Sequence, residues 1–155
     1  MIGLYRGTSF VSRVIRWFGW SRYSHASWLD IGTMTEWEAW TTKGVTRAYF
    51  GINHTPGTRV DLYELRKPLS LLDAKLLTDF LDEQVGDKYD YRGIVSFALH
   101  WLGASKDKWF CSELVFDGLL SAGRRILNGL EAYQVAPGDI AKSTDLFCVG
   151  YMIVG

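Results

Sequence analysis

The stretch KWFCSELVF, residues 108–116, is the part of the sequence that decides the fold. An aromatic pair ends there, and apolar residues follow Cys111 at helical spacing until Gly123, so we expect a helix that begins at Cys111. The free backbone N–H groups and the positive dipole end of a first helical turn favour an anion, so a thiol there tends toward the nucleophilic thiolate. The alternative interpretation is that Cys111 packs as a small apolar residue.

Length and composition indicate one compact domain over residues 1–155. Hydrophobic residues make up 48% of the chain and aromatic residues 15%, which is enough apolar surface for a core. Seventeen basic and seventeen acidic side chains cancel, so charge gives no reason to expect nucleic acid as a partner. The sequence has no recognisable secretion signal and no apolar window of membrane-spanning length. We therefore expect a cytoplasmic protein, with delivery by a non-standard route as the alternative.

The two cysteines, Cys111 and Cys148, are too few for a disulfide framework. No CxxC pair or His/Cys cluster has the spacing of a zinc site. We expect free thiols, no metal and no cofactor, since side chains and backbone donors suffice for thiol chemistry. Cys148 falls in the apolar segment 146–154, which is typical of a central strand, so we expect it in the core.

The remaining patterns predict strands first, then helices, then one late strand. Strands are predicted over 23–31, 34–40, 44–50 and 59–65, and helices over 10–18, 70–85 and 94–102. This order is typical of an α+β layered domain. The basic, aromatic segment Phe10–Trp20 is interpreted as a packed helix, with peripheral contact to lipid headgroups as the alternative.

A cysteine nucleophile needs a base, and histidine is the usual one. The chain has three histidines. His54 falls in a turn-rich loop and His100 in an apolar helix, whereas His25 stands at the start of a predicted strand. His25 is therefore the candidate base, although a lone histidine on a strand is often structural.

The base needs a third group that orients it. If segments 23–31 and 34–40 pair as a hairpin, residues 38–40 lie alongside His25, so the Glu38 carboxylate can reach the imidazole. Glu36 competes on the same strand face but lies nearer the turn. For both carboxylates the alternative is a solvent-facing charge.

Four motifs in this order resemble a known family: SHA at 24–26, EA at 38–39 with GV at 44–45, GDKYDY at 86–91, and WFCSELV at 109–115. Together they are similar to the circularly permuted NlpC-type cysteine hydrolases, the YiiX-like branch of the papain-like superfamily. The resemblance extends from about residue 1 to residue 151 and includes APGD at 136–139. The histidine precedes the cysteine, as permutation implies. The segment MIGLYRG at 1–7 departs from the Gly-Asp-Ile strand with which many relatives begin.

The resemblance implies a papain-like α+β fold, with a central antiparallel sheet packed against helices and the nucleophile at a helix N-terminus. It implies Cys111 as nucleophile, His25 as general base and acid, and Glu38 as the orienting group. Tyr89, with Tyr91 as the alternative, would complete an oxyanion site together with the Cys111 backbone N–H.

The activity that the resemblance implies is hydrolysis of an amide through an acyl-enzyme. The substrate would be a peptide or acyl-amide, and peptides of the bacterial cell wall are the commonest class in the family. Acyl transfer to an amine or lipid, as in the lecithin retinol acyltransferase branch, is the first alternative. A noncatalytic binding module is the second.

Overall fold

The structure of the chain, a computed structural model, describes residues 1–7, 12–13, 16–17, 20–40, 42–89 and 108–155. Of Tyr89, Lys108 and Trp109 it describes the backbone alone. The predicted helix 94–102 and Tyr91 lie outside the described residues, as does most of the predicted helix 10–18.

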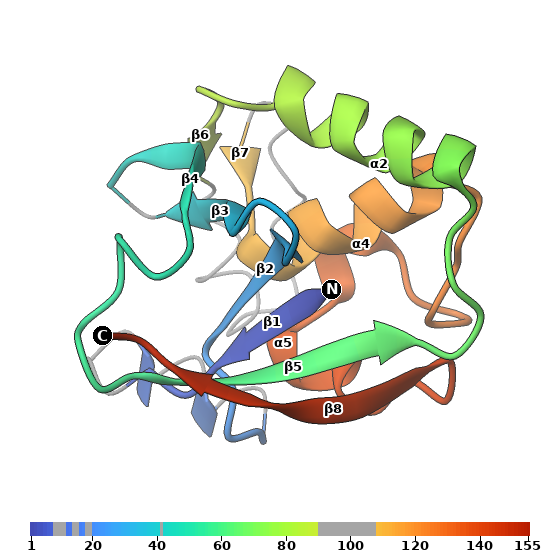
Figure 1. The fold of residues 1–155 in the computed structure, drawn as a ribbon. Helices are drawn as coiled ribbons and strands as arrows, with labels where there is room; N and C mark the ends of the chain where they lie inside the picture. The colour runs from blue at the N-terminus through green and yellow to red at the C-terminus, as the bar shows by residue number, and fades with distance from the viewer. Residues whose placement is uncertain (8–11, 14–15, 18–19, 41, 90–107) are drawn as a thin grey trace.

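A six-stranded antiparallel sheet organises the molecule (Figure 1). Its spatial order is β4-β3-β2-β1-β5-β8. The strands are β1 (Ile2–Tyr5), β2 (His25–Asp30), β3 (Thr35–Trp40), β4 (Gly44–Tyr49), β5 (Arg59–Leu65) and β8 (Leu146–Ile153). Two further short strands, β6 (Lys88–Tyr89) and β7 (Lys108–Trp109), pair in parallel as a separate sheet. The α+β class expected from the sequence is therefore present.

Two helices pack side by side against one face of this sheet (Figure 1). They are α2 (Leu71–Glu83) and α4 (Cys111–Ser121), followed by the short helices η1 (Ala132–Gln134) and α5 (Pro137–Ile140). Helix α2 begins after Ser70, whose hydroxyl accepts from the Asp73 N–H at 3.1 Å while the Asp73 carboxylate accepts from the Ser70 N–H at 3.4 Å. These two reciprocal hydrogen bonds satisfy two backbone N–H groups that have no partner within the first turn of the helix.

The main core lies between the sheet and the two helices, and a smaller cluster lies on the other sheet face. The main core includes Leu4, Ala26, Trp37, Leu77, Leu114 and Leu119, and the smaller cluster contains Tyr5, Leu29, Val60, Leu62 and Val154. Strand β1 supplies both faces, and all four of its residues are buried. A strand buried on both faces shows no polar alternation. This explains why the sequence marks residues 2–5 only as a short apolar segment.

The last strand corrects two predictions. β8 lies at the edge of the sheet and pairs with β5, whereas its apolar sequence predicted a central strand. Cys148 on this strand is exposed, not buried in the core. The apolar character is partly accounted for by surface contacts, since the guanidinium of Arg59 lies over the Tyr151 ring at 3.9 Å. Hydrophobicity alone did not distinguish an edge strand from a central one.

Among the described residues, no helix has both the length and the apolar character needed to cross a bilayer.

The turn that joins β3 to β4 requires glycine at position 44. Gly44 has a φ of +72°, and a Cβ there would lie 2.0 Å from the Asp87 carbonyl oxygen. That oxygen accepts from the Val45 N–H at 2.8 Å, and the Gly86 N–H donates to the Val45 carbonyl at 2.9 Å. These bonds tie the chain that leads into β6 to the start of β4.

Candidate functional site

The β2–β3 hairpin brings His25 and Glu38 together, as the sequence predicted. Ser27 is paired with Glu38 in the register of the two strands. His25 Nε2 lies 3.1 Å from Glu38 Oε2, and the Trp40 ring stacks on the imidazole with centroids 4.8 Å apart. Strand pairing and the Trp40 contact together fix the plane and direction of the His25 ring.

Glu38 is almost fully buried and accepts from three side chains. Besides His25, Asn53 Nδ2 lies 2.8 Å from its Oε1 and His54 Nε2 lies 2.8 Å from its Oε2. Burial alone would raise the pKa of Glu38, but the hydrogen bonds from His25 and His54 outweigh burial and hold the pKa well below its usual range. Glu38 is therefore a buried carboxylate anion, not the solvent-facing charge of the alternative interpretation.

Glu36, the competing carboxylate, has different partners. It is buried, and it accepts from the Tyr5 hydroxyl and from the Gly51 N–H, the latter at 3.1 Å. Burial and the neighbouring Glu36 raise the pKa of Tyr5 far above its usual range, so the phenol stays protonated and donates. Glu36 thus anchors β1 and the loop after β4, while Glu38 bonds the histidine.

His54, Asn53 and Tyr5 also belong to this cluster, although no sequence pattern predicted them there. The loop after β4 returns across the face of β3, because Gly51 binds Glu36 and Asn53 and His54 bind Glu38. The signal was present in the sequence as two glutamates on one strand face. Two buried carboxylates need several donors, and a nearby loop with Asn and His can supply them.

Cys111 is the first residue of α4, as predicted, and it is completely buried. Phe110 occupies the N-cap position without a side-chain capping bond, and its N–H donates to the Glu113 carboxylate of the same first turn at 3.2 Å. The Ser112 hydroxyl donates to the Val135 carbonyl and attaches this turn to the segment before α5. The helix start is held in place by packing and by this buried hydrogen bond.

His25 interacts with both Cys111 and Glu38. Burial disfavours the imidazolium, but charge and hydrogen-bond interactions with Cys111 and then with Glu38 outweigh burial and raise the pKa of His25 to about 10. Because Nε2 lies against Glu38, Nδ1 is the ring nitrogen left for the sulfur. A pKa this high favours the protonated imidazole at neutral pH, and the ring stands between the Cys111 sulfur and the Glu38 carboxylate.

Of the two tyrosines expected at the oxyanion site, Tyr89 alone falls within the described residues. The Tyr89 backbone pairs with Trp109 across β6 and β7, two positions before Cys111. Its side chain is not described, and Tyr91 lies outside the described residues. Their oxyanion role stays a prediction.

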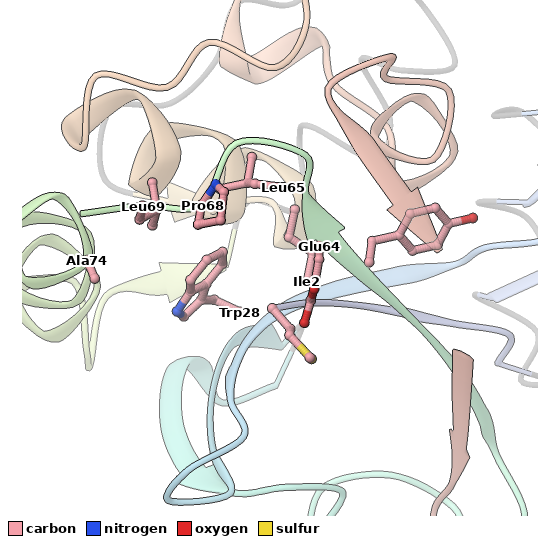
Figure 2. Close-up of a pocket in the computed structure, with 9 residues that line it drawn as sticks. Ile2, Trp28, Glu64, Leu65, Pro68, Leu69 and Ala74 are labelled. Carbon is pink, nitrogen blue, oxygen red and sulfur yellow. The ribbon is translucent and has the colours of Figure 1, made fainter. Parts of the chain in front are cut away.

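A separate cavity of about 410 Å³ lies beside Trp28 of β2 (Figure 2). Trp28 forms one wall, and the start of β1, the end of β5 and the loop into α2 form the others. Its lining residues are Met1, Ile2, Trp28, Tyr63, Glu64, Leu65, Pro68, Leu69 and Ala74. It contains none of the candidate catalytic residues.

No known protein family matches the sequence, and no curated protein does so either. Among solved structures, the arrangement is that of a YiiX-like α+β fold. The similar structure is metalloprotein YiiX from Escherichia coli O157:H7, with a TM-score of 0.72 and 17% sequence identity over 97% of this chain and 95% of that one. This similarity shows the fold.

Proposed function

We propose that the protein is a papain-like thiol hydrolase that cleaves an amide through an acyl-enzyme on Cys111. The observation that supports this most is the position of His25, which interacts with Cys111 on one side and bonds Glu38 on the other. A nucleophile, a base and a group that orients the base are the three parts that such chemistry needs. All three come from separate elements, α4, β2 and β3.

The proposed reaction begins with attack of the Cys111 thiolate on the amide carbonyl. A carbon–sulfur bond forms, and the imidazolium of His25 gives its proton to the leaving amine as the carbon–nitrogen bond breaks. His25 then takes a proton from water, which attacks the thioester and releases the acid. Glu38 keeps its charge and holds the ring in register, with two further donors fixing the carboxylate.

The substrate class we propose is a peptide amide, and bacterial cell-wall peptides are the first candidates within that class. The oxyanion would be stabilised by the Cys111 backbone N–H and by Tyr89. Since Cys111 is completely buried, neighbouring side chains must move before a substrate carbonyl reaches the sulfur. A protein in which side chains must move in this way would distinguish small reagents from large substrates.

Acyl transfer to a lipid or amine acceptor is the second candidate function. Trp17 and Trp20 are 72% and 92% exposed, and both lie in the basic, aromatic segment Phe10–Trp20. Exposed tryptophans beside arginines are typical of surfaces that contact lipid headgroups. The two reactions share the acyl-enzyme and differ in product, because water gives a free acid and an acceptor gives a transferred acyl chain.

The test uses a Cys148→Ser background, because Cys148 is exposed and would react with any thiol reagent. The protein is incubated with soluble cell-wall fragments and with short synthetic peptides, and products are followed by mass spectrometry. We expect a new amine and a new carboxylate in equal amounts, lost in Cys111→Ala and in His25→Ala. An acyl adduct on the Cys111 peptide, trapped by acid quenching, would be the intermediate.

Alkylation of the same proteins by iodoacetamide needs no known substrate. We expect iodoacetamide to alkylate Cys111 despite its burial. The rate should be at least ~10-fold lower in His25→Ala than in the protein with His25. The noncatalytic module predicts slow alkylation that His25→Ala does not change. That result would contradict the hydrolase and the transferase alike.

A further inference from the structure

Three largely buried side chains converge on one point next to the candidate thiol. One ligand atom from each of His25, His54 and Glu38 lies within 4.8 Å of the other two. The two ring nitrogens lie 3.1 Å and 2.8 Å from the same carboxylate oxygen. The side chains are 12%, 5% and 1% exposed. The proposed hydrolase needs one histidine as its base, and it uses His54 only as a donor to Glu38.

The geometry matches the ligand set of a borderline divalent metal. Zinc binds imidazole nitrogen and carboxylate oxygen at about 2.0–2.2 Å, which places tetrahedral ligands roughly 3.3 Å apart. The two nitrogen–oxygen separations are close to that value, and the ligand atoms all lie within 4.8 Å of one another, so rotations of the side chains can bring them around one ion. Two nitrogen ligands favour zinc over magnesium or calcium, which prefer oxygen. We propose that His25, His54 and Glu38 form a three-ligand site for Zn2+ or a similar transition-metal ion.

The surroundings hold each ligand in a binding orientation. The Tyr5 ring lies parallel to His54 at 3.8 Å, and Trp40 stacks on His25. Asn53 Nδ2 donates to the second oxygen of Glu38, which directs the first oxygen toward the histidines. Such outer contacts fix tautomer and direction and contribute strongly to metal affinity. Three protein ligands leave the fourth tetrahedral position open to water.

Metal binding has a consequence that rests on the proposed function. An ion on His25 Nε2 replaces the proton that lies between this nitrogen and Glu38, and the ring then keeps its remaining proton on Nδ1. A ring bound in this way has no free lone pair to take a proton from the thiol or from water. The metal-loaded protein would therefore be an inactive form of the hydrolase, released by a chelator.

The site is tested by titrating metal-free protein with Zn2+ in a calorimeter, in a variant that carries both Cys111→Ser and Cys148→Ser. We expect one ion per chain and a rise in the melting temperature that grows with the metal concentration. Co2+ should bind with the visible absorption of a tetrahedral ion, without the bands of thiolate ligation. Absence of stoichiometric binding would overturn the proposal, and so would loss of binding on removal of the cysteines relative to the wild type.

Two single variants assign the ligands. His54→Gln keeps a donor for Glu38 but removes a good zinc ligand, and we expect Zn2+ affinity to fall at least ~100-fold. His25→Gln should give a similar loss, with folding of both variants checked by circular dichroism without metal. Affinity that is unchanged in either folded variant would contradict the site. Because His54→Gln keeps a donor for Glu38 and His54 is neither nucleophile nor base, failure of this test leaves the hydrolase proposal standing, and failure to find any amidase leaves the metal site standing.

Discussion

The ring of Tyr5 lies parallel to the ring of His54, with centroids 3.8 Å apart and an interplanar angle of 6°. The same phenol donates its hydroxyl proton to the buried carboxylate of Glu36. One side chain of the central strand β1 thus supports both buried glutamates, directly at Glu36 and through His54 at Glu38. The Tyr5 ring also lies edge-on to the His25 ring, with centroids 5.3 Å apart, so the candidate site depends on this tyrosine at three of its residues.

Replacement of Tyr5 by Phe separates the two contacts. Tyr5→Phe keeps the stacked ring but removes the donor to Glu36, and we expect a loss of about 1–3 kcal/mol in the free energy of unfolding. Urea denaturation measures this loss. Tyr151→Phe is the matched control, because Tyr151 is 56% exposed and its change should cost under ~0.5 kcal/mol. Equal losses in the two variants would show that the Glu36 bond contributes little.

The two buried glutamates should affect different properties. In the Cys148→Ser background, Glu38→Gln removes the charge beside His25, and we expect iodoacetamide to alkylate Cys111 at least ~10-fold more slowly. Glu36→Gln should lower the free energy of unfolding about as much as Glu38→Gln does, but it should leave the alkylation rate of the folded protein unchanged. Rates are compared well below the melting temperature of each variant. A slower rate in Glu36→Gln alone would reverse the assignment of the orienting carboxylate.

The part of the site on regular elements was predictable from the sequence. Period-two alternation gave the hairpin, the hairpin register gave Glu38 as the partner of His25, and the helical pattern gave Cys111 as the start of α4. Each of these inferences uses contacts that are fixed by local periodicity. They needed no knowledge of how distant segments fold over one another.

The part supplied by loops and strand order was not predictable in this way. His54 reaches Glu38 because residues 50–58 fold back over β3, and no local pattern encodes that path. Likewise, the apolar sequence of β8 is compatible with a central or an edge position, and the pairing of distant strands decides between them. Buried charge gave the one usable hint, since two glutamates inside a sheet require partners from elsewhere.

The pH dependence of stability should report on Asp117 in α4. Burial and the neighbouring Glu131 outweigh Arg125 and raise the pKa of Asp117 to about 6, above the ordinary value of 3.8. The folded state therefore holds a proton that the unfolded state has released between these two values, and this carboxyl makes stability fall as pH rises from about 4 to about 6.

Asp117→Asn tests this dependence. Above pH 6 the variant avoids the cost of a partly buried charge, and we expect a gain of about 1 kcal/mol at pH 7.5, after allowance for solvent screening. At pH 4 the wild-type carboxyl carries little of this cost, so the two proteins should have nearly equal free energies of unfolding. A gain of the same size at both pH values would point to packing instead of charge.

Gly44 and Gly57 form a natural pair for testing the β3–β4 connection. Both have a left-handed φ, +72° and +82°, so alanine at either position costs about 1–2 kcal/mol in backbone strain. At Gly57 a Cβ meets no atom within 4 Å, whereas at Gly44 it would lie 2.0 Å from the Asp87 carbonyl oxygen.

We therefore expect Gly44→Ala to be less stable than Gly57→Ala by a further 1–3 kcal/mol or so, the usual cost of overpacking. Unfolding in urea measures both. The Asp87 carbonyl accepts from the Val45 N–H, and residue 87 directly precedes β6. Gly44→Ala should therefore also speed amide hydrogen exchange at Val45 and Gly86, whereas Gly57→Ala should not. Equal stabilities would mean that residues 86–87 move aside freely, and the chain before Tyr89 would then not be held by β4.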